Sequence, residues 1–174
     1  SEPIASADVA SALADDIGYP VIIKAAAGGG GIGMQIVHQA DEFESALKLC
    51  QSRAKSAFGD ERVFVEKYIQ GAQHVEFQVL ADGKNAIHFG ERFCSIQRRH
   101  QKLVEEGPWL TDEKRSEIGS LVCKGAEAVG YKGLATFEFL RDANGDFYFL
   151  EVNPRVQVEH TVTACLLYTS PSPR

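Results

Sequence analysis

The sequence predicts an α+β fold with two lobes: a small β-β-α-β lobe, followed by part of a larger lobe built on an antiparallel sheet. Two observations carry this prediction. Short segments rich in β-branched and aromatic residues alternate along the chain with longer segments whose apolar residues recur at helical spacing. Two of the strand-like segments are separated by Asn144-Gly145, the strongest short-range signal for a β-hairpin and hence for antiparallel pairing.

The small lobe is expected over residues 20–71, after a lead-in helix within residues 1–19. Gly18 and Pro20 close that helix, because glycine commonly ends helices and proline cannot continue one. Asp41 is expected to cap the second helix. The predicted elements are, in order, a helix over 7–17, strands over 21–25 and 34–38, a helix from residue 41 and a strand over 62–68.

The larger lobe is expected over residues 72–163. Thr111 caps its helix, and the predicted elements are strands over 74–80 and 85–90, a helix over 111–129, and strands over 134–140 and 147–153. Residues 164–174 lose the amphipathic pattern and end in Ser-Pro-Ser-Pro-Arg, which cannot form regular structure. We expect this tail to be non-native and joined to a truncated protein, with a native flexible terminus as the alternative.

The composition is that of a globular protein, with 44% hydrophobic residues. A formal net charge of −6 argues against a protein that coats nucleic acid. The four cysteines are widely spaced and form no CxxC pair, which favours reduced thiols in a cytosolic type of compartment. No apolar run is long enough to span a membrane and no signal peptide opens the chain. We therefore expect a cytoplasmic protein, or a mitochondrial matrix protein in a eukaryote.

Two glutamates in the predicted hairpin are candidates for a metal site. A two-residue turn centred on Asn144-Gly145 places Glu138 opposite Glu151, with their Cβ atoms about 5 Å apart. Directly opposed like charges destabilise a sheet, and a shared cation removes that penalty. Carboxylate oxygens suit Mg²⁺, and Asn153 adds a neutral oxygen on the same face as Glu151. The pattern predicts a magnesium site in a phosphate-handling enzyme.

A glycine-rich segment, residues 27–33, lies between two predicted strands. It fits the letters GxGxxG, but a dinucleotide site requires a helix after the glycines, and a strand follows here. A glycine loop between antiparallel strands can instead fold over nucleotide phosphates, with Lys24 placed to neutralise their charge. The alternatives are a flexible hairpin tip and an exposed strand lysine. By position alone, residues 65–69 are candidates for backbone contacts to adenine.

Two polar segments indicate an anion site. Residues 95–102 are the densest basic stretch, and a pocket for small anions fits this acidic chain better than a solvated loop or a nucleic-acid surface. Residues 155–160 alternate strictly, so an extended conformation places Arg155, Gln157 and Glu159 on one side. An arginine and a glutamate there can bind an oxyanion and remove its proton. The alternative is a surface ion pair.

These motifs together resemble the ATP-grasp superfamily, and specifically the biotin carboxylases. The similar segments run almost continuously over residues 18–163; they are GYPVIIKAAAGGGGIGM, FVEKYI, HVEFQVLADG, ERFCSIQRRHQKLVEE, GYKGLATFEFL and FYFLEVNPRVQVEHTVT. Asn-Pro-Arg is shared with other ATP-grasp enzymes such as carbamoyl phosphate synthetase. RRHQK combined with RVQVEH is much more specific to biotin-dependent carboxylases. The resemblance implies an ATP-grasp fold in which the small lobe is the lid and the larger lobe belongs to the core.

The resemblance also implies roles for individual residues. Contacts to ATP are implied for Lys24, Gly30, Gly31, Met34, Glu66, Lys67, Ile69, His74, Gln97 and His100. Ligands of Mg²⁺ (or Mn²⁺), with two ions expected, are implied to be Glu138, Glu151 and Asn153. Contacts to bicarbonate are implied for Lys102, Arg155, Gln157, Val158 and Glu159. Among these, Lys102, Arg155 and Glu159 are the implied catalytic residues, with Glu159 as general base.

The implied activity is the ATP- and bicarbonate-dependent carboxylation of biotin on a carrier domain or protein, through carboxyphosphate. The implied partners are that carrier, a carboxyltransferase component and further copies of the enzyme in a homodimer or larger assembly, without nucleic acid or membrane. The acceptor stays open among acetyl-CoA, propionyl-CoA, methylcrotonyl-CoA, pyruvate and urea. Ile32 stands where many relatives carry Arg or Lys, and the family's N-terminal domain and its biotin-enolate arginine are absent, so we expect this fragment itself to be inactive. The alternatives are an ATP-grasp ligase that joins a carboxylate to an amine, and a non-catalytic nucleotide-binding remnant.

Overall fold

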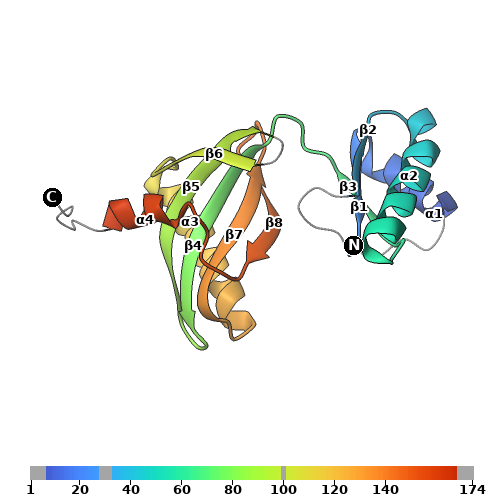
Figure 1. The fold of residues 1–174 in the computed structure, drawn as a ribbon. Helices are drawn as coiled ribbons and strands as arrows, with labels where there is room; N and C mark the ends of the chain where they lie inside the picture. The colour runs from blue at the N-terminus through green and yellow to red at the C-terminus, as the bar shows by residue number, and fades with distance from the viewer. Residues whose placement is uncertain (1–6, 28–32, 99–100, 168–174) are drawn as a thin grey trace. The chain divides into compact units, whose positions relative to one another are not determined.

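The computed structural model describes residues 7–27, 33–98 and 101–167. The chain divides into two compact units, Ser1–Gln70 and Gly71–Arg174, and each is described by itself. Both units combine helices with an antiparallel sheet, as Figure 1 shows. Within the described ranges, no helix is both long enough and apolar enough to cross a membrane.

The first unit packs two helices against a three-stranded antiparallel sheet with the order β2-β1-β3 (Figure 1). Its elements are α1 (Ala7–Ile17), β1 (Val21–Ala25), β2 (Met34–Val37), α2 (Ala40–Phe58) and β3 (Val63–Lys67). Val21 and Ile23 of β1 are fully buried in a core with Phe43 and Leu47 of α2. Because side chains alternate along a strand, Lys24 points to the face opposite these helices.

Helix α2 begins one residue earlier than expected, and the predicted cap at Asp41 is wrong. Gln39 is the N-cap residue, and its side chain makes no capping hydrogen bond. The Glu42 carboxylate instead accepts a hydrogen bond of 3.2 Å from the backbone N of His38. Asp41 lies in the first turn, where a negative charge interacts favourably with the helix dipole.

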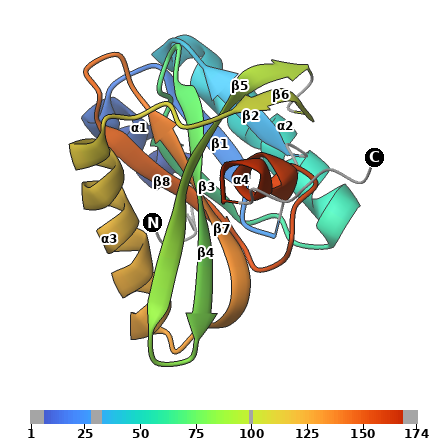
Figure 2. The ribbon, with the colours of Figure 1, turned by 90° about the vertical axis from the view of Figure 1, so that its left-hand side faces the viewer.

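The second unit is a five-stranded antiparallel sheet with the order β6-β5-β4-β7-β8. Its elements are β4 (Gln73–Asp82), β5 (Ala86–Arg98), β6 (Gln101–Glu106), α3 (Asp112–Ala128), β7 (Lys132–Arg141), β8 (Phe147–Asn153) and α4 (His160–Leu167). Helices α3 and α4 lie on opposite sides of the sheet (Figure 2). Phe77 of β4 belongs to the core that forms with Ile118 and Val122 of α3. Thr111 caps α3 as predicted, because its Oγ1 accepts a hydrogen bond from Lys114 N at 3.3 Å.

The basic segment forms strands that were not predicted. Strand β5 continues to Arg98, eight residues beyond the predicted end at Gly90, and β6 begins at Gln101. The register places Lys102 opposite Gln97, so the two strands form a hairpin. Among the described residues of this segment, Arg98 and Lys102 therefore lie on strands of the sheet.

The prediction of an extended segment over residues 155–160 is wrong. Glu159 lies in a turn, and α4 begins at His160. Backbone hydrogen bonds from His160 N to Gln157 O at 3.2 Å and from Val162 N to Glu159 O at 3.1 Å form these turns. The helix continues past the predicted boundary at residue 164 as far as Leu167, and residues 168–174 lie outside the described residues.

The hairpin between β7 and β8 has a longer turn than the predicted two-residue turn at Asn144-Gly145. Asp142 N donates to Asp146 O at 3.0 Å, and residues 142–146 connect the strands. The side chain of Asp142 explains this conformation, because its Oδ1 accepts hydrogen bonds of 2.9 Å from the backbone N of both Asn144 and Asp146. An aspartate that bonds to nearby backbone N–H groups stabilises a turn of its own.

Candidate functional site

A row of four charged side chains crosses the second sheet, on the face opposite α3. Arg92 on β5 lies opposite Glu76 on β4, Glu76 opposite Glu138 on β7, and Glu138 opposite Glu151 on β8. Arg92, Glu76 and Glu138 are buried. Neighbouring like charges on one face destabilise a sheet. The three carboxylates therefore require further positive charge nearby.

The opposition of Glu138 and Glu151, which the sequence predicts, is confirmed, but it depends on an irregularity in β8. Phe149 lies opposite Phe139, and Glu151 lies opposite Glu138, so Leu150 is an extra residue between the two pairs. Such a β-bulge interrupts the alternation of side chains, and bulges are common beside active sites. Phe149 consequently shares the core side of the sheet with Phe139, whereas Glu151 shares the open face with Glu138.

Lys102 on β6 supplies positive charge to this face. Its Nζ donates a hydrogen bond of 2.6 Å to Glu159 Oε1 and one of 3.1 Å to Glu138 Oε1, and it also contacts Glu76 Oε2. The lysine side chain is only 15% exposed, so water and salt screen these interactions less than they screen surface pairs. One ammonium group thus holds carboxylates from β4, from β7 and from the turn that precedes α4.

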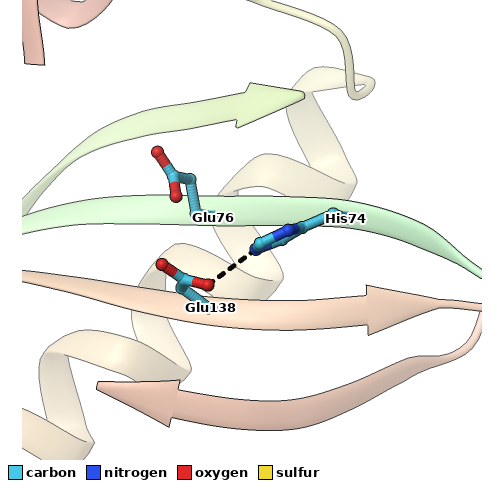
Figure 3. Close-up of side chains that lie close together, drawn as sticks. All are labelled: His74, Glu76 and Glu138. Carbon is cyan, nitrogen blue, oxygen red and sulfur yellow. Dashed lines mark ion pairs between the residues drawn. The ribbon is translucent and has the colours of Figure 1, made fainter. Parts of the chain in front are cut away.

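His74, Glu76 and Glu138 point toward one another from β4 and β7 (Figure 3). His74 Nε2 lies 2.8 Å from Glu138 Oε2, and its Nδ1 lies 2.7 Å from the amide nitrogen of Gln97. Because an amide nitrogen can only donate, Nδ1 accepts from Gln97, and Nε2 is the ring atom that faces Glu138 Oε2. Three such groups could hold a metal ion, but Lys102 Nζ contacts both glutamates, which explains the cluster as the binding site of the lysine.

These contacts determine the charges of the cluster. Burial tends to raise the pKa of Glu138, but hydrogen bonds from His74 and Gln157 and the charge of Lys102 lower it to about 2. Burial also opposes ionisation of Glu159, and the hydrogen bond from Lys102 outweighs it, so this pKa is below its usual value. Burial alone would lower the pKa of Lys102, whereas attraction to Glu76 and hydrogen bonds to Glu159 and Glu76 raise it. All three groups are therefore charged at neutral pH.

The structure brings the three predicted metal ligands together. Asn153 Nδ2 donates a hydrogen bond of 3.0 Å to Glu138 Oε1 and one of 3.1 Å to Glu151 Oε1. Both carboxylates therefore direct an oxygen at the Asn153 amide. Rotation of that amide by half a turn presents its oxygen instead of its nitrogen, which gives two carboxylates and one amide oxygen. This is the donor set that Mg²⁺ prefers, so the residues fit the ion.

Two of the residues assigned to bicarbonate turn toward the same cluster. Gln157 is buried, and its Nε2 donates to Glu138 Oε1 at 2.9 Å. Glu159 reaches Lys102, as described above. Lys102, Gln157 and Glu159 are thus grouped around Glu138, although the segment that carries Gln157 and Glu159 is a turn and not a strand.

The other two bicarbonate candidates lie at the surface of the second unit. Arg155 is exposed, and its guanidinium donates to the carbonyl of Val156 at 3.2 Å. Val158 is 89% exposed. Within the described residues, the structure therefore does not bring the side chains of Arg155 and Val158 into the cluster around Lys102.

In the first unit, Lys24 and Glu66 form an ion pair across β1 and β3. Lys24 Nζ lies 2.5 Å from Glu66 Oε2, and the lysine side chain is 25% exposed. Met34 lies directly opposite Lys24 on β2. The face of this small sheet away from the helices therefore carries a lysine, a glutamate and a half-buried methionine side by side.

The remaining nucleotide candidates lie at the end of β3 or outside the described residues. Lys67 Nζ donates to the carbonyls of Gly18 at 2.7 Å and Tyr19 at 3.2 Å, so its side chain stabilises the turn before β1. Ile69 is half-buried just after the strand. Gly30, Gly31 and His100 lie outside the described residues, as does Ile32.

The sequence interpretation missed Glu76, Arg92 and Thr163, which complete the cluster. Arg92 Nε donates to Glu76 Oε1 at 2.6 Å, and its Nη1 donates to Thr163 Oγ1 at 2.7 Å. A signal for Glu76 was present, because the strand-like segment around it places polar residues at His74, Glu76 and Gln78 among apolar ones. When one face of a strand is apolar and the other is polar, the polar residues face either solvent or a functional site.

The family model for the ATP-binding domain of the carbamoyl-phosphate synthase L chain matches residues 1–167. The chain belongs to this family. A pyruvate carboxylase subunit from Methanothermobacter thermautotrophicus is 55% identical over 163 residues, which cover 92% of this chain and 33% of that protein. This family member thus spans about a third of the length of the curated relatives it matches.

Solved structures agree with this assignment. The biotin carboxylase–βγ-ATP complex from Campylobacter jejuni superimposes with a TM-score of 0.88 at 51% identity, over 94% of this chain and 37% of that one. The biotin carboxylase domain of Hydrogenobacter thermophilus 2-oxoglutarate carboxylase, solved with MgADP, ADP and bicarbonate, gives a TM-score of 0.88 at 47% identity over the same shares. The predicted ATP-grasp fold and the resemblance to biotin carboxylases are confirmed.

Proposed function

We propose that this chain is part of an enzyme that uses ATP and bicarbonate to carboxylate biotin on a carrier domain or protein. The contact between Lys102 and Glu159, made beside the metal-ligand set, carries this proposal. Phosphorylation of bicarbonate requires a cation to hold the anion, a base to take its proton and Mg²⁺ to neutralise phosphate charge. The names of the similar proteins, which are carboxylases, support the same reaction.

Lys102 and Glu159 are proposed to hold the anion and to take its proton. A bicarbonate ion that binds the Lys102 ammonium weakens the bond which lowers the pKa of Glu159, so Glu159 gains proton affinity as the substrate arrives. Glu159 then accepts the hydroxyl proton of bicarbonate while that oxygen attacks the γ-phosphorus of ATP. The bond from phosphorus to the β-phosphate oxygen breaks, ADP leaves and bicarbonate becomes carboxyphosphate. Arg155 and Gln157 are proposed to orient the anion, with Val158 contributing its backbone.

Glu138, Glu151 and Asn153 are proposed to hold Mg²⁺ (or Mn²⁺), which neutralises phosphate charge when it is bound. Two ions are proposed. Lys24 would supply a further cation for the phosphates. Contacts to ATP are proposed for Lys24, Gly30, Gly31, Met34, Glu66, Lys67, Ile69, His74, Gln97 and His100.

The proposed partners follow from the reaction. A biotin carrier domain or protein must deliver the acceptor nitrogen, and a carboxyltransferase component must consume carboxybiotin. A second copy of the enzyme is proposed as a further partner, and neither nucleic acid nor membrane takes part. The proposed location is the cytoplasm, or the mitochondrial matrix in a eukaryote.

The experiment that tests this function is the substitution Glu159→Gln in the full-length protein. The amide cannot accept the bicarbonate proton, so we expect bicarbonate-dependent ATP cleavage to fall at least about 100-fold, within the range of general-base contributions. Binding of MgATP should stay within two-fold, because Glu159 contacts Lys102 and not the proposed nucleotide residues. Glu113→Gln is the matched control, since Glu113 is exposed on α3 at the opposite side of the sheet.

Three outcomes of this experiment would contradict the proposal. Wild-type turnover by Glu159→Gln would exclude Glu159 as the base. Cleavage of ATP that an amine stimulates, and that biotin and bicarbonate do not, would favour a carboxylate–amine ligase. A full-length protein that binds MgATP and never cleaves it would be a nucleotide-binding remnant.

A further inference from the structure

Arg92 is a completely buried cation in the middle of the second sheet. Its side chain is 0% exposed, as is that of its partner Glu76. A buried charge is tolerated when it is paired and its remaining N–H groups are bonded. Arg92 meets this condition through bonds to Glu76 Oε1 at 2.6 Å, Gln78 Oε1 at 2.9 Å and Thr163 Oγ1 at 2.7 Å, with a longer contact of 3.4 Å to Thr136 Oγ1.

These partners connect Arg92 to both sides of the Lys102–Glu159 pair. Glu76 is the first connection, because one of its oxygens accepts from Arg92 and the other contacts Lys102. Arg92 thereby fixes the carboxylate that holds the lysine. A planar guanidinium fixes the orientation of its partners better than a lysine ammonium does, because its donors form a rigid fork.

Thr163 on α4 is the second connection. Thr163 is 5% exposed, and its hydroxyl accepts a hydrogen bond from Arg92 Nη1. Helix α4, which carries Thr163, begins at the residue directly after Glu159. The bond from Arg92 therefore holds the first turn of α4, and with it the adjoining turn that carries Glu159, against the sheet.

We propose that Arg92 is a positioning residue for the bicarbonate reaction, which fixes Lys102 through Glu76 and Glu159 through Thr163. The inference rests on the proposed function, since the two residues that Arg92 positions are those proposed to bind bicarbonate and take its proton. In this proposal, Arg92 itself contacts neither ATP nor bicarbonate. It acts by keeping Lys102 of β6 and Glu159, which precedes α4, close to each other.

A purely structural arginine would give different behaviour. Loss of a structural contact lowers the stability of the unit and leaves the kinetic constants of the folded enzyme unchanged. Loss of a positioning contact changes the constants for bicarbonate while those for ATP stay the same. Thr163 offers the gentler test, because valine has nearly the same shape and removes the hydroxyl alone.

The test compares Thr163→Val with Thr163→Ser in the full-length protein. For Thr163→Val we expect kcat/KM for bicarbonate to fall about ten-fold, the usual effect of losing one hydrogen bond to a charged group, with KM for ATP within two-fold of wild type. Thr163→Ser keeps the hydroxyl and should keep kcat/KM for bicarbonate within two-fold. Hydrogen exchange of the α4 amides should become faster in Thr163→Val and not in Thr163→Ser.

Arg92→Lys provides a second, independent variant. The lysine keeps the charge beside Glu76 but cannot also bond to Thr163 through a rigid fork. We expect the same selective loss in kcat/KM for bicarbonate, and a fall in stability with unchanged kinetic constants would contradict the proposal. Unchanged bicarbonate kinetics in Thr163→Val, with an active wild type, would overturn the inference while leaving the proposed function intact. A wild-type protein without bicarbonate-dependent ATP cleavage would overturn the proposed function, and the inference with it.

Discussion

The low pKa of Glu138 leads to a prediction about acid stability. Its pKa is about 2 in the folded chain, compared with an ordinary value of 4.5. The difference corresponds to about 3 kcal/mol of stabilisation, and the side chain is only 6% exposed, so solvent screens it little. Because the folded-state value is depressed, this stabilisation is fully present above pH 4.5 and is lost as the pH falls toward 2. About 2 of the 3 kcal/mol should be lost by pH 3.

The substitution Glu138→Gln removes this titration while keeping the size of the side chain. We expect the difference in unfolding free energy between wild type and Glu138→Gln to shrink by about 2 kcal/mol between pH 6 and pH 3. Urea unfolding of the 174-residue chain measures it, with fluorescence of Trp109, the single tryptophan, which stacks on Phe93 in the second unit. A difference for Glu138→Gln that stays constant between pH 6 and pH 3 would refute the assigned pKa and its causes.

Two further substitutions test the metal ligands and the core. Glu151→Gln should weaken binding of Mg²⁺ about ten-fold, measured as a smaller magnesium-dependent rise in melting temperature, whereas Glu44→Gln at an exposed surface pair should leave that rise unchanged. Gly119→Ala should destabilise the second unit by about 1–3 kcal/mol in urea unfolding, because its Cβ would lie 2.4 Å from the His88 ring. Gly125→Ala on the same helix is the control, since its Cβ would meet ordinary contacts at 3.6 Å and alanine favours a helix. Equal destabilisation by both glycine substitutions would contradict the packing argument.

Local signals predicted much of this structure. The first helix has the predicted bounds, Ala7–Ile17, because its apolar periodicity and its closing glycine and proline agree. The opposed pair Glu138 and Glu151 was predicted from the turn dipeptide, although the turn is longer and the bulge at Leu150 restores the register. The pairing beside the turn differs from the predicted register by one residue, and the bulge, which was not predicted, shifts the register back by one. The two errors therefore cancel at Glu138.

Other features could not be read from local patterns. Strand β6 was missed because Leu103 and Val104 are both exposed, so the segment lacks the alternation of a half-buried strand. Arg92 was missed because its partners come from three other elements, and no sequence spacing places Glu76 and Thr163 beside it. The alternation of residues 155–160 was a false strand signal, because this segment forms a turn that leads into α4.

The extra residue in β8 divides that strand into two segments whose odd-numbered side chains lie on opposite faces of the sheet. Phe147 and Phe149 pack toward Phe139 on the side of α3, whereas Glu151 and Asn153 serve the open face, although all four have odd numbers. In a regular strand, residues of one parity share one environment, so selection for packing and selection for ligands act on interleaved positions. In β8 the odd-numbered positions instead face the α3 side before Leu150 and the open face after it. A substitution at an odd-numbered residue of β8 therefore alters aromatic contacts if it lies before the bulge, and the proposed ligands if it lies after it.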